Sequence, residues 1–478
     1  MSRTVTLFLA CMVSGSFLFF LNIEKAVGAM RTVFYPILYV SGHYSDNKDQ
    51  TELNKKEEYY TTYGTALSLR FIQESSTVTV IYNPEFNDRS TMDDGKNSIE
   101  HNASLQAHAQ ASPRVIMDLN LVYDGHDSDV GNESWEHTGR FTTTVDFTDK
   151  TRAELGLNYV DVFQRQQLSG EYREHVDYGG SVNVIHRFGQ NNQAGVYLNY
   201  SIVDYKPPVT LGENDYRSYG PTVSLSYWFS HLWGMDGTAE YEKTDYDVLD
   251  DDVDTWSGNV RLMRRISPRL LGYAKYEHIY SDRKINDVTM YIPSVGFAWD
   301  VSEDTGISLG AGYIFQEWDT ENNGQFFMDA DVFKGFDLSR HTRLHVSATS
   351  GIDPTSDVSS DFGFQVFYQS GFLLTWQMRE NLSANLRGAW SRDEFIEPVV
   401  NRIDTSWQAG AGLTWSPWRW GDVLMSYGYE DFNTDSSQRE DYQEHRGTLT
   451  FQVHPTYAWD GGREESTPEE INQRIYND

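Results

Sequence analysis

Charged residues of both signs recur at even spacing along this chain of 478 residues. Lys275 and Glu277, for example, would project from the same face of an extended strand, because successive side chains alternate between its two faces. Such a face can do electrostatic chemistry: its charges can form ion pairs in a hydrated wall, or stand in transverse rows that steer a solute. The candidates for this face are Arg70, Asp118, Arg140, Glu154, Arg261, Arg265, Lys275, Glu277, Asp329, Asp331, Arg343, Arg387, Glu430 and Arg446.

The two signs are nearly balanced in this set. A strongly anion-conducting pore, or one that exports an acidic polysaccharide, would present a dominant basic lining. We therefore expect mostly ion pairs along the wall. The sequence leaves open whether some of the charges form transverse rows.

Catalytic patterns are weak in this chain. No Gly-x-Ser-x-Gly element lies between a strand and a helix, and no pair of histidines has metal-ligand spacing on a helix. The histidines are scattered, as shown by His101, His108, His137, His341 and His345. We predict a protein that is not an enzyme and has no cofactor; a barrel hydrolase with a Ser/His or Asp/His site is the remaining catalytic alternative.

Clustered carboxylates are the other candidate site. The segment "DVLDDDVD" at 247–254 could bind calcium, or bridge lipopolysaccharide through divalent ions, because carboxylates suit hard cations. The ligand and glycine spacing of an EF-hand is missing, so we expect a solvated loop and no metal site.

The elements that must position these charges are strands. In residues 406–432, apolar side chains alternate with small or polar ones, which is the period of two of a β-strand. The apolar positions are Trp407, Ala409, Ala411, Leu413, Trp415, Val423, Met425, Tyr427 and Tyr429. Such a face either packs on a soluble core or meets lipid around a wet lumen.

The same unit of strand, loop, strand and turn recurs from Val33 to Val453. Short turns are predicted at 73–76, 148–151 and 302–305, and longer acidic loops at 124–136, 248–255 and 353–361. This alternation is typical of outer-membrane barrels, whose strands are about 10 residues long. We predict an all-β, transmembrane, antiparallel up-and-down β-barrel of about 22 strands (roughly 18 to 24), with short periplasmic turns and longer extracellular loops.

The outer face of this barrel can be assigned from the same period. Residues predicted to face lipid include Leu67, Leu69, Val196, Leu198, Phe362, Phe364, Val366 and Tyr368. The 14% of aromatic residues fits two interfacial girdles. The net charge of -32 argues against a nucleic-acid partner.

The N-terminus has the organisation of a secretory signal peptide. Arg3 precedes an apolar run at 5–23, and small residues follow at 27–29. Removal of this leader would take Cys11, which is the one cysteine of the chain, so the mature protein would have no disulfide.

We therefore expect three segments: a signal peptide at 1–29, a barrel at 30–456 in the outer membrane of a Gram-negative bacterium, and a periplasmic tail at 457–478. In the tail, Thr467 and Pro468 favour the start of a short helix. Strand signals begin close behind the leader, so we expect no plug domain of the kind that precedes a TonB-type transporter barrel.

Three segments near the N-terminus carry a family resemblance: "FYPILYVSGHYSDN" at 34–47, "VIYNPEFNDRS" at 80–90 and "IEHNASLQAHAQASPR" at 99–114. With the hairpin repeat that follows, the chain resembles the β-barrel porin 2 group of bacterial outer-membrane proteins. The resemblance implies a porin-like barrel that often accompanies exopolysaccharide-production systems, and it supplies no active-site residue.

The leading functional expectation is a porin-like channel for passive passage of hydrophilic solutes. An accessory role in exopolysaccharide secretion, with periplasmic secretion proteins as partners, is the second expectation, and a barrel enzyme is the third. Expected partners in every case are outer-membrane lipid, lipopolysaccharide and the barrel-assembly machinery. The oligomeric state stays open.

Overall fold

A computed structural model describes most of the chain behind the predicted leader. The described residues are 30–52, 55–89, 97–128, 133–165, 172–206, 215–247, 252–283, 287–318, 322–353, 364–396, 402–436, 440–455 and 459–460. The predicted signal peptide at 1–29 and the predicted helix near Thr467 lie outside them.

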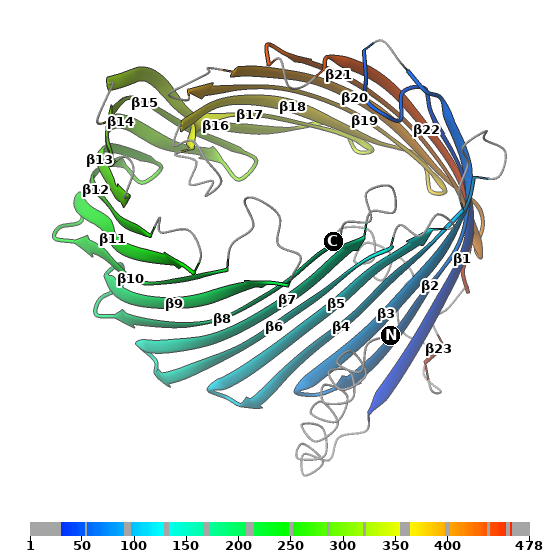
Figure 1. The fold of residues 1–478 in the computed structure, drawn as a ribbon, viewed down its shortest axis with the longest axis horizontal. Coiled ribbons are helices and arrows are strands. Elements are labelled where there is room, and N and C mark those ends of the chain that lie inside the picture. The colour runs from blue at the N-terminus through cyan, green and yellow to red at the C-terminus, as the bar shows by residue number, and fades with distance from the viewer. Residues whose placement is uncertain are drawn as a thin grey trace.

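Twenty-two long antiparallel strands, each paired with the next along the chain, form one closed barrel in these residues (Figure 1). The predicted fold class and strand number are confirmed. The first eleven strands are β1 Arg31–Ser45, β2 Glu58–Gln73, β3 Ser76–Asp88, β4 Ser98–Ser112, β5 Val115–Ser128, β6 Glu133–Thr148, β7 Thr151–Arg165, β8 Tyr172–Arg187, β9 Gln193–Tyr205, β10 Tyr216–Trp228 and β11 Trp233–Tyr246. The others are β12 Val253–Ser267, β13 Leu270–Arg283, β14 Val288–Ser302, β15 Thr305–Trp318, β16 Asn322–Ser339, β17 Thr342–Asp353, β18 Phe364–Arg379, β19 Leu382–Ile396, β20 Arg402–Trp418, β21 Gly421–Thr434 and β22 Tyr442–Val453.

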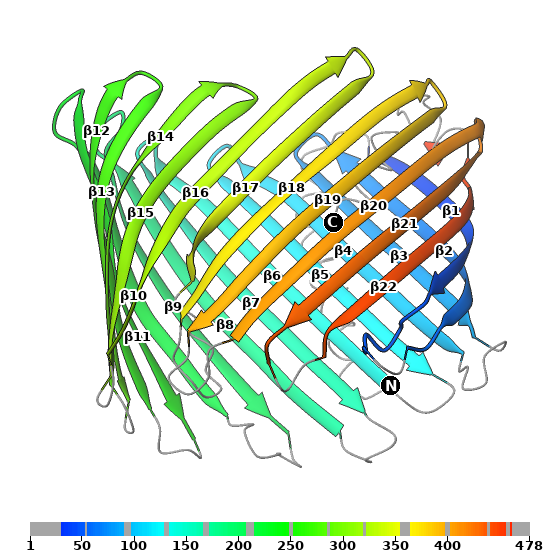
Figure 2. The same cartoon turned by 90° about the horizontal axis from the view of Figure 1, so that it is seen from above.

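The connections differ at the two ends of the barrel. At one end, here called the turn end, hairpins are tight: β12 ends at Ser267 and β13 begins at Leu270 (Figure 2). At the other, the loop end, the connections are mostly longer, as between β1 and β2. Among the described residues no helix is long and apolar enough to cross a bilayer.

Several strands run further into the predicted acidic loops than expected. The predicted loop at 124–136 is mostly strand, because β5 continues to Ser128 and β6 begins at Glu133. Cross-strand contacts continue at this end: the Tyr241 hydroxyl donates a hydrogen bond to Asp254 across 2.5 Å. The ladder therefore extends beyond the roughly 10 residues that a bilayer requires.

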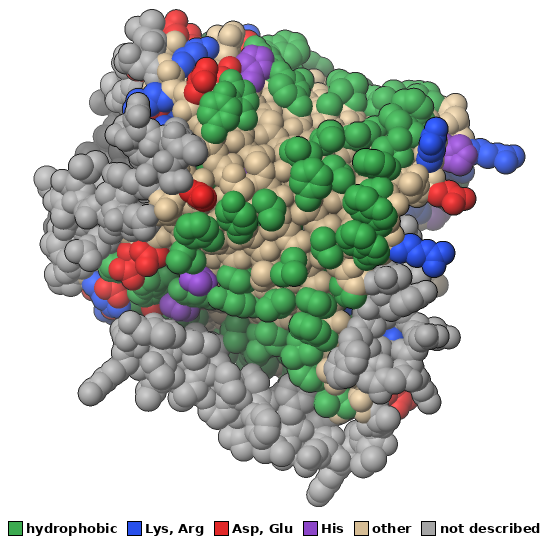
Figure 3. Space-filling view, turned by 90° about the vertical axis from the view of Figure 1, so that its right-hand side faces the viewer, with side chains coloured by type: hydrophobic (Ala, Val, Ile, Leu, Met, Phe, Trp, Pro, Cys, Tyr) green, Lys and Arg blue, Asp and Glu red, His purple; other side chains and the backbone are tan. Residues whose placement is uncertain are grey.

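Large apolar side chains cover the outer face. In Figure 3 they form a broad band, with charged and histidine side chains toward its edges. On two neighbouring strands, Val184 is 38% exposed and Leu198 is 49% exposed. Soluble monomers rarely expose an apolar surface of this extent, so the band is the surface that a bilayer would contact.

The barrel closes between its first and last strands. Leu38 pairs with Val453 and Ser45 with Arg446, and a two-residue strand, β23 (Trp459–Asp460), pairs with Val33 and Phe34. This short strand falls within the segment predicted as a tail. Near the seam, His454 Nε2 lies 3.2 Å from Asp422 Oδ2; His454 is buried and Asp422 is partly buried.

Glycines on the inner face make room for long side chains that cross them. Tyr39, Gly64 and Glu85 are register neighbours on β1, β2 and β3. The Tyr39 ring lies over Gly64, where a Cβ atom would overlap it, and its hydroxyl donates a hydrogen bond to Glu85. One tyrosine thus fixes the position of a carboxylate two strands away.

We predict that Val182→Arg destabilises the barrel in a bilayer by about 2–4 kcal/mol. Val182 faces outward between Leu155 and Leu198, further from the turn end than Val184, so an arginine there meets hydrocarbon. The matched control is Asn183→Arg on the same strand, whose side chain faces the lumen and should stay hydrated. Urea titration of reversible folding into lipid vesicles measures both. Equal losses in the two variants would contradict the assignment of faces.

We also predict that Gly64→Ala destabilises the barrel by about 1–3 kcal/mol, because the new methyl group displaces the Tyr39 ring. The control is Gly42→Ala on β1, where nothing lies within 4 Å of the added Cβ atom. The same folding titration should place this control within about 0.5 kcal/mol of the parent. A Gly64→Ala variant as stable as the control would rule out the proposed contact.

Candidate functional site

The strand register places every predicted lumen residue on the face opposite the apolar band. For example, Arg140 pairs with Asn120 on β5 and with Asn158 on β7, whereas its neighbour Phe141 pairs with Leu119 and Leu157. The same assignment holds for Arg70, Asp118, Arg140, Glu154, Arg261, Arg265, Lys275, Glu277, Asp329, Asp331, Arg343, Arg387, Glu430 and Arg446. These side chains lie on different sectors of the wall, so they do not form one compact site.

Many of these charges form ion pairs within the wall. The Arg261 guanidinium donates to both carboxylate oxygens of Asp236, with Nη2 2.6 Å from Oδ2 and Nε 3.1 Å from Oδ1. Lys275 Nζ lies 2.6 Å from Glu277 Oε2. Exposed pairs of this kind add about 1 kcal/mol or less to stability, so their main effect is to neutralise the local field.

Transverse rows are present as well. Tyr273, Gly296, Gly310 and Asp329 follow one another in register across β13 to β16. Cβ atoms added at the two glycines would lie 2.5 Å and 2.7 Å from the Tyr273 hydroxyl, so the ring lies flat across both strands toward Asp329. On the β12 side of this row, the Arg261 guanidinium carbon lies over the Tyr273 ring, 5.8 Å from the ring centre.

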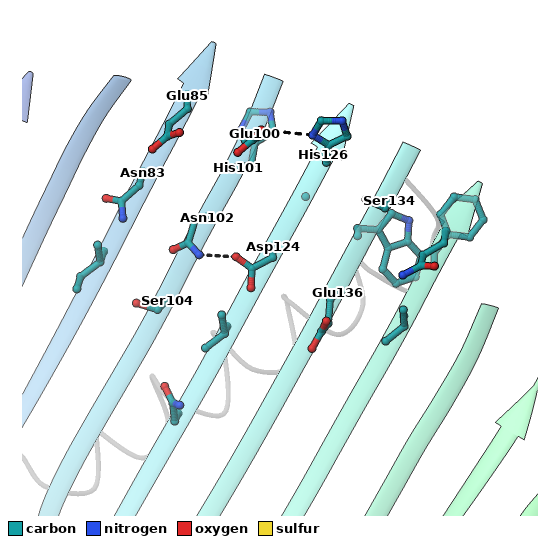
Figure 4. Close-up of a pocket in the computed structure, with 18 of the residues that line it drawn as sticks. Asn83, Glu85, Glu100, His101, Asn102, Ser104, Asp124, His126, Ser134 and Glu136 are labelled. Carbon is teal, nitrogen blue, oxygen red and sulfur yellow. Dashed lines mark hydrogen bonds and ion pairs between the residues drawn. The ribbon is translucent and has the colours of Figure 1, made fainter. Parts of the chain in front are cut away.

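A hollow of about 1050 Å³ lies over β3 to β7, and carboxylates and amides make up most of its polar lining (Figure 4). Its carboxylates are Glu85, Glu100, Asp124 and Glu136. Asn102 donates a hydrogen bond to Asp124, and His126 Nδ1 lies 3.6 Å from Glu100 Oε1. The lining has no lysine or arginine, so this sector of the wall is acidic.

A register row with two arginines stands on the facing sector. Arg387, Gly410, Gly428 and Arg446 stand in one register row across β19 to β22. Arg446 pairs with Glu430 and lies 3.3 Å from Glu444, whereas Arg387 has no ion pair in the part of the chain that the structure describes. Figure 1 shows β3–β6 and β19–β21 on opposite sides of the ring. The lumen face of this second sector carries both signs, because Asp404 and Glu430 lie on it as well.

Sequence reasoning missed the carboxylates of the hollow and the tyrosines that cross glycines. Glu85, Glu100, Asp124 and Glu136 were not among the predicted lumen residues, although each lies on the lumen side of its strand by register. The period of two could have shown this lumen position, because Glu85 on β3 and Glu100 on β4 are each an odd number of residues from an outward residue, Tyr82 or Ala103. The row of Tyr273 and its two glycines could not be found without the pairing of four strands.

No arrangement typical of a catalytic centre is seen in the described residues. Gly306-Ile-Ser308-Leu-Gly310 matches a nucleophile pattern by letter, but it lies inside β15 and not at a strand-to-helix turn. His126 is a register neighbour of Glu100 and Ser134, and no hydrogen bond joins it to the serine within the described contacts. Groups of side chains placed to hold a metal ion are likewise absent from the described residues.

Comparison with known proteins gives similarity at the level of fold. No family model and no curated protein sequence matches the chain. A mutant of the ferric enterobactin receptor PfeA from Pseudomonas aeruginosa, solved with enterobactin, is similar with a TM-score of 0.60 and 8% identity, over 88% of this chain and 81% of that one.

Two further receptors have the same architecture. The FrpB iron transporter of Neisseria meningitidis is similar with a TM-score of 0.60 and 8% identity, over 90% of this chain and 83% of that one. The siderophore receptor PirA of Acinetobacter baumannii gives a TM-score of 0.55 and 9% identity, over 88% and 80%. At this identity the likeness shows a large closed antiparallel barrel and does not assign a ligand.

Proposed function

We propose that this chain is an outer-membrane pore through which small hydrophilic solutes pass passively, with a preference for cations. The observation that carries the proposal is the two-faced wall: an apolar band outside, and inside a surface of amides, hydroxyls, ion pairs and one acidic hollow. Such a wall fits a bilayer on one side and a water-filled lumen on the other. The fold shared with outer-membrane receptors supports the same location.

Passive conduction fits the chemistry of the lining. Solute entry needs contacts strong enough to replace water and weak enough to release, and hydrogen-bonding side chains spread over many strands supply such contacts. In the hollow, Asn102 pairs with Asn83 on one side and with Asp124 on the other, so amides and carboxylates lie side by side. A solute that crosses this surface can exchange one weak partner for the next.

Cation preference follows from the carboxylates of the hollow, which have no lysine or arginine partner among the described residues. The sequence indicated a balanced lining, but the wall also carries Glu85, Glu100, Asp124 and Glu136, with no arginine or lysine lining the same hollow. A focused negative potential raises the local concentration of cations. The single positive charge of Arg387 on the opposite wall would reduce the preference for cations, but it does not outweigh the four carboxylates.

The similar solved structures include a ferric enterobactin receptor and siderophore receptors, and we do not extend those ligands to this chain. Membership of the β-barrel porin 2 group stays a prediction from resemblance. A role in polysaccharide secretion also stays a prediction.

We predict that the purified protein in a planar bilayer under a salt gradient gives a reversal potential of the sign that marks cation preference. Replacing the four carboxylates, as Glu85→Gln, Glu100→Gln, Asp124→Asn and Glu136→Gln together, should lower the cation-to-anion permeability ratio by roughly twofold or more, because these charges act on ions within a Debye length of about 8 Å. The opposite control, Arg387→Gln, should raise the ratio. Single-channel recordings that show no conductance would overturn the proposed function, and an unchanged ratio in both variants would overturn the assigned selectivity.

A further inference from the structure

The barrel wall divides at its loop end between β16 and β17. The pairing of these strands runs from Ser339 with Thr342 to Ala330 with Ser350 and then stops. β16 nevertheless begins eight residues before Ala330, at Asn322, and β17 continues to Asp353. Beyond Ala330 the two strands part.

An apolar cluster then joins two faces that a regular barrel keeps apart. On β14, β15 and β16 its members belong to the lumen face: Val288, Met290, Ile292, Ile314 and Phe327. On β17, β18 and β19 its members belong to the outer face: Ile352, Phe364, Val366, Tyr368 and Ile396. The lumen face of one sheet therefore packs on the outer face of the next.

This packing places the loop ends of β17, β18 and β19 inside the lumen. In Figure 1 the end of β17, in yellow, lies on the inner side of β14 and β15. Ile314 and Val366, from the two layers, are both 0% exposed. We name residues 351–353, 364–368 and 392–396 the flap.

A polar contact crosses the same overlap. Gln325 Nε2 on β16 donates a hydrogen bond to Glu394 Oε2 on β19, across 3.1 Å, although β17 and β18 separate these strands in the sheet order. Arg392 Nε donates to the other oxygen of Glu394, across 2.9 Å. The flap is thus held by the apolar cluster and by the hydrogen bond between Gln325 and Glu394 at its edge.

We propose that the flap sets the upper size of the solutes that the pore admits. The inference rests on the proposed function and names the element that determines its selectivity by size. Two sheets packed face to face lie about 10 Å apart, so the flap occupies that depth of the lumen beside β14–β16. Its outer-face apolar residues are shielded from water by this inward fold, which gives the fold its stability.

Cross-linking tests the position of the flap. In a Cys11→Ser background, which removes the only cysteine of the chain, Gln325→Cys with Glu394→Cys should be joined by a short bismaleimide in the folded barrel. Such a reagent spans the distance of about 10 Å between packed sheets, which is too long for a disulfide. The control pair is Gln325→Cys with Gln369→Cys, whose second residue faces the lumen on β18 and belongs to neither layer of the cluster. A cross-link in the first pair and none in the control is the expected result, and its absence from the first pair would overturn the overlap.

Permeation tests the role of the flap. Val366→Asn, which puts an amide into the cluster, should raise the single-channel conductance and allow larger neutral polyethylene glycols to enter the pore. The control Val122→Asn adds the same group to the lumen wall of β5 and should leave the size limit as in the parent. Cross-linking of the Gln325→Cys and Glu394→Cys pair in the Val366→Asn protein by the same bismaleimide should restore the original limit.

The outcomes separate the two proposals. A parent barrel that does not conduct contradicts the proposed pore and also the proposed size limit. The cross-link still reports the position of the flap in that case. A parent and a folded Val366→Asn variant with the same conductance and the same size limit contradict the inference alone. If Val366→Asn does not fold, Ile352→Asn at the edge of the cluster takes its place.

Discussion

Backbone hydrogen bonding without water is the constraint on which this structure depends. Within a bilayer each N–H and C=O group needs a partner in the protein, and a sheet meets that need only when its last strand pairs with its first. Here the pairing of β1 with β22 satisfies the condition. Once the ring is closed, register decides which side chains meet lipid and which meet the lumen, because a shift of one residue would exchange the two faces.

The same constraint relaxes at the loop end, where water can satisfy the backbone. The pairing of β16 with β17 ends at Ala330, about one bilayer-spanning strand length from the turn end. Beyond that point, burial of apolar side chains decides the path of the chain, and the strands divide into two packed layers. Lumen shape and barrel closure thus have different physical causes.

Much of the architecture could be predicted from sequence because a period of two is local information. Trp407 and Leu413 indicate an outward face without knowledge of any partner strand, and tight turns such as that between Thr148 and Thr151 mark strand ends. These signals gave the fold class and the strand number. They did not give the strand lengths at the loop end, where cross-strand pairs extend the ladder into acidic segments.

The flap and the lumen rows depend on contacts between strands that are distant in sequence. Phe364 and Val366 keep the same period as lipid-facing residues, so the sequence predicted them in the band, and that prediction was wrong because they are buried in the cluster. Phe362, predicted with them, lies outside the described residues. In the same way, Tyr273 acquires its role only because two glycines stand beside it on neighbouring strands.

Cysteine scanning of β9 tests the two-faced wall most directly. Single cysteines placed in turn at residues 195–202, in a Cys11→Ser background, would be exposed to a membrane-impermeant maleimide after the barrel is inserted into lipid vesicles. Rapid labelling at odd positions such as Asn199, and protection at even positions such as Val196 and Leu198, is the predicted result, because odd side chains face a hydrated lumen and even ones face hydrocarbon. Protection at the odd positions, or labelling without alternation, would contradict the account of a water-filled pore.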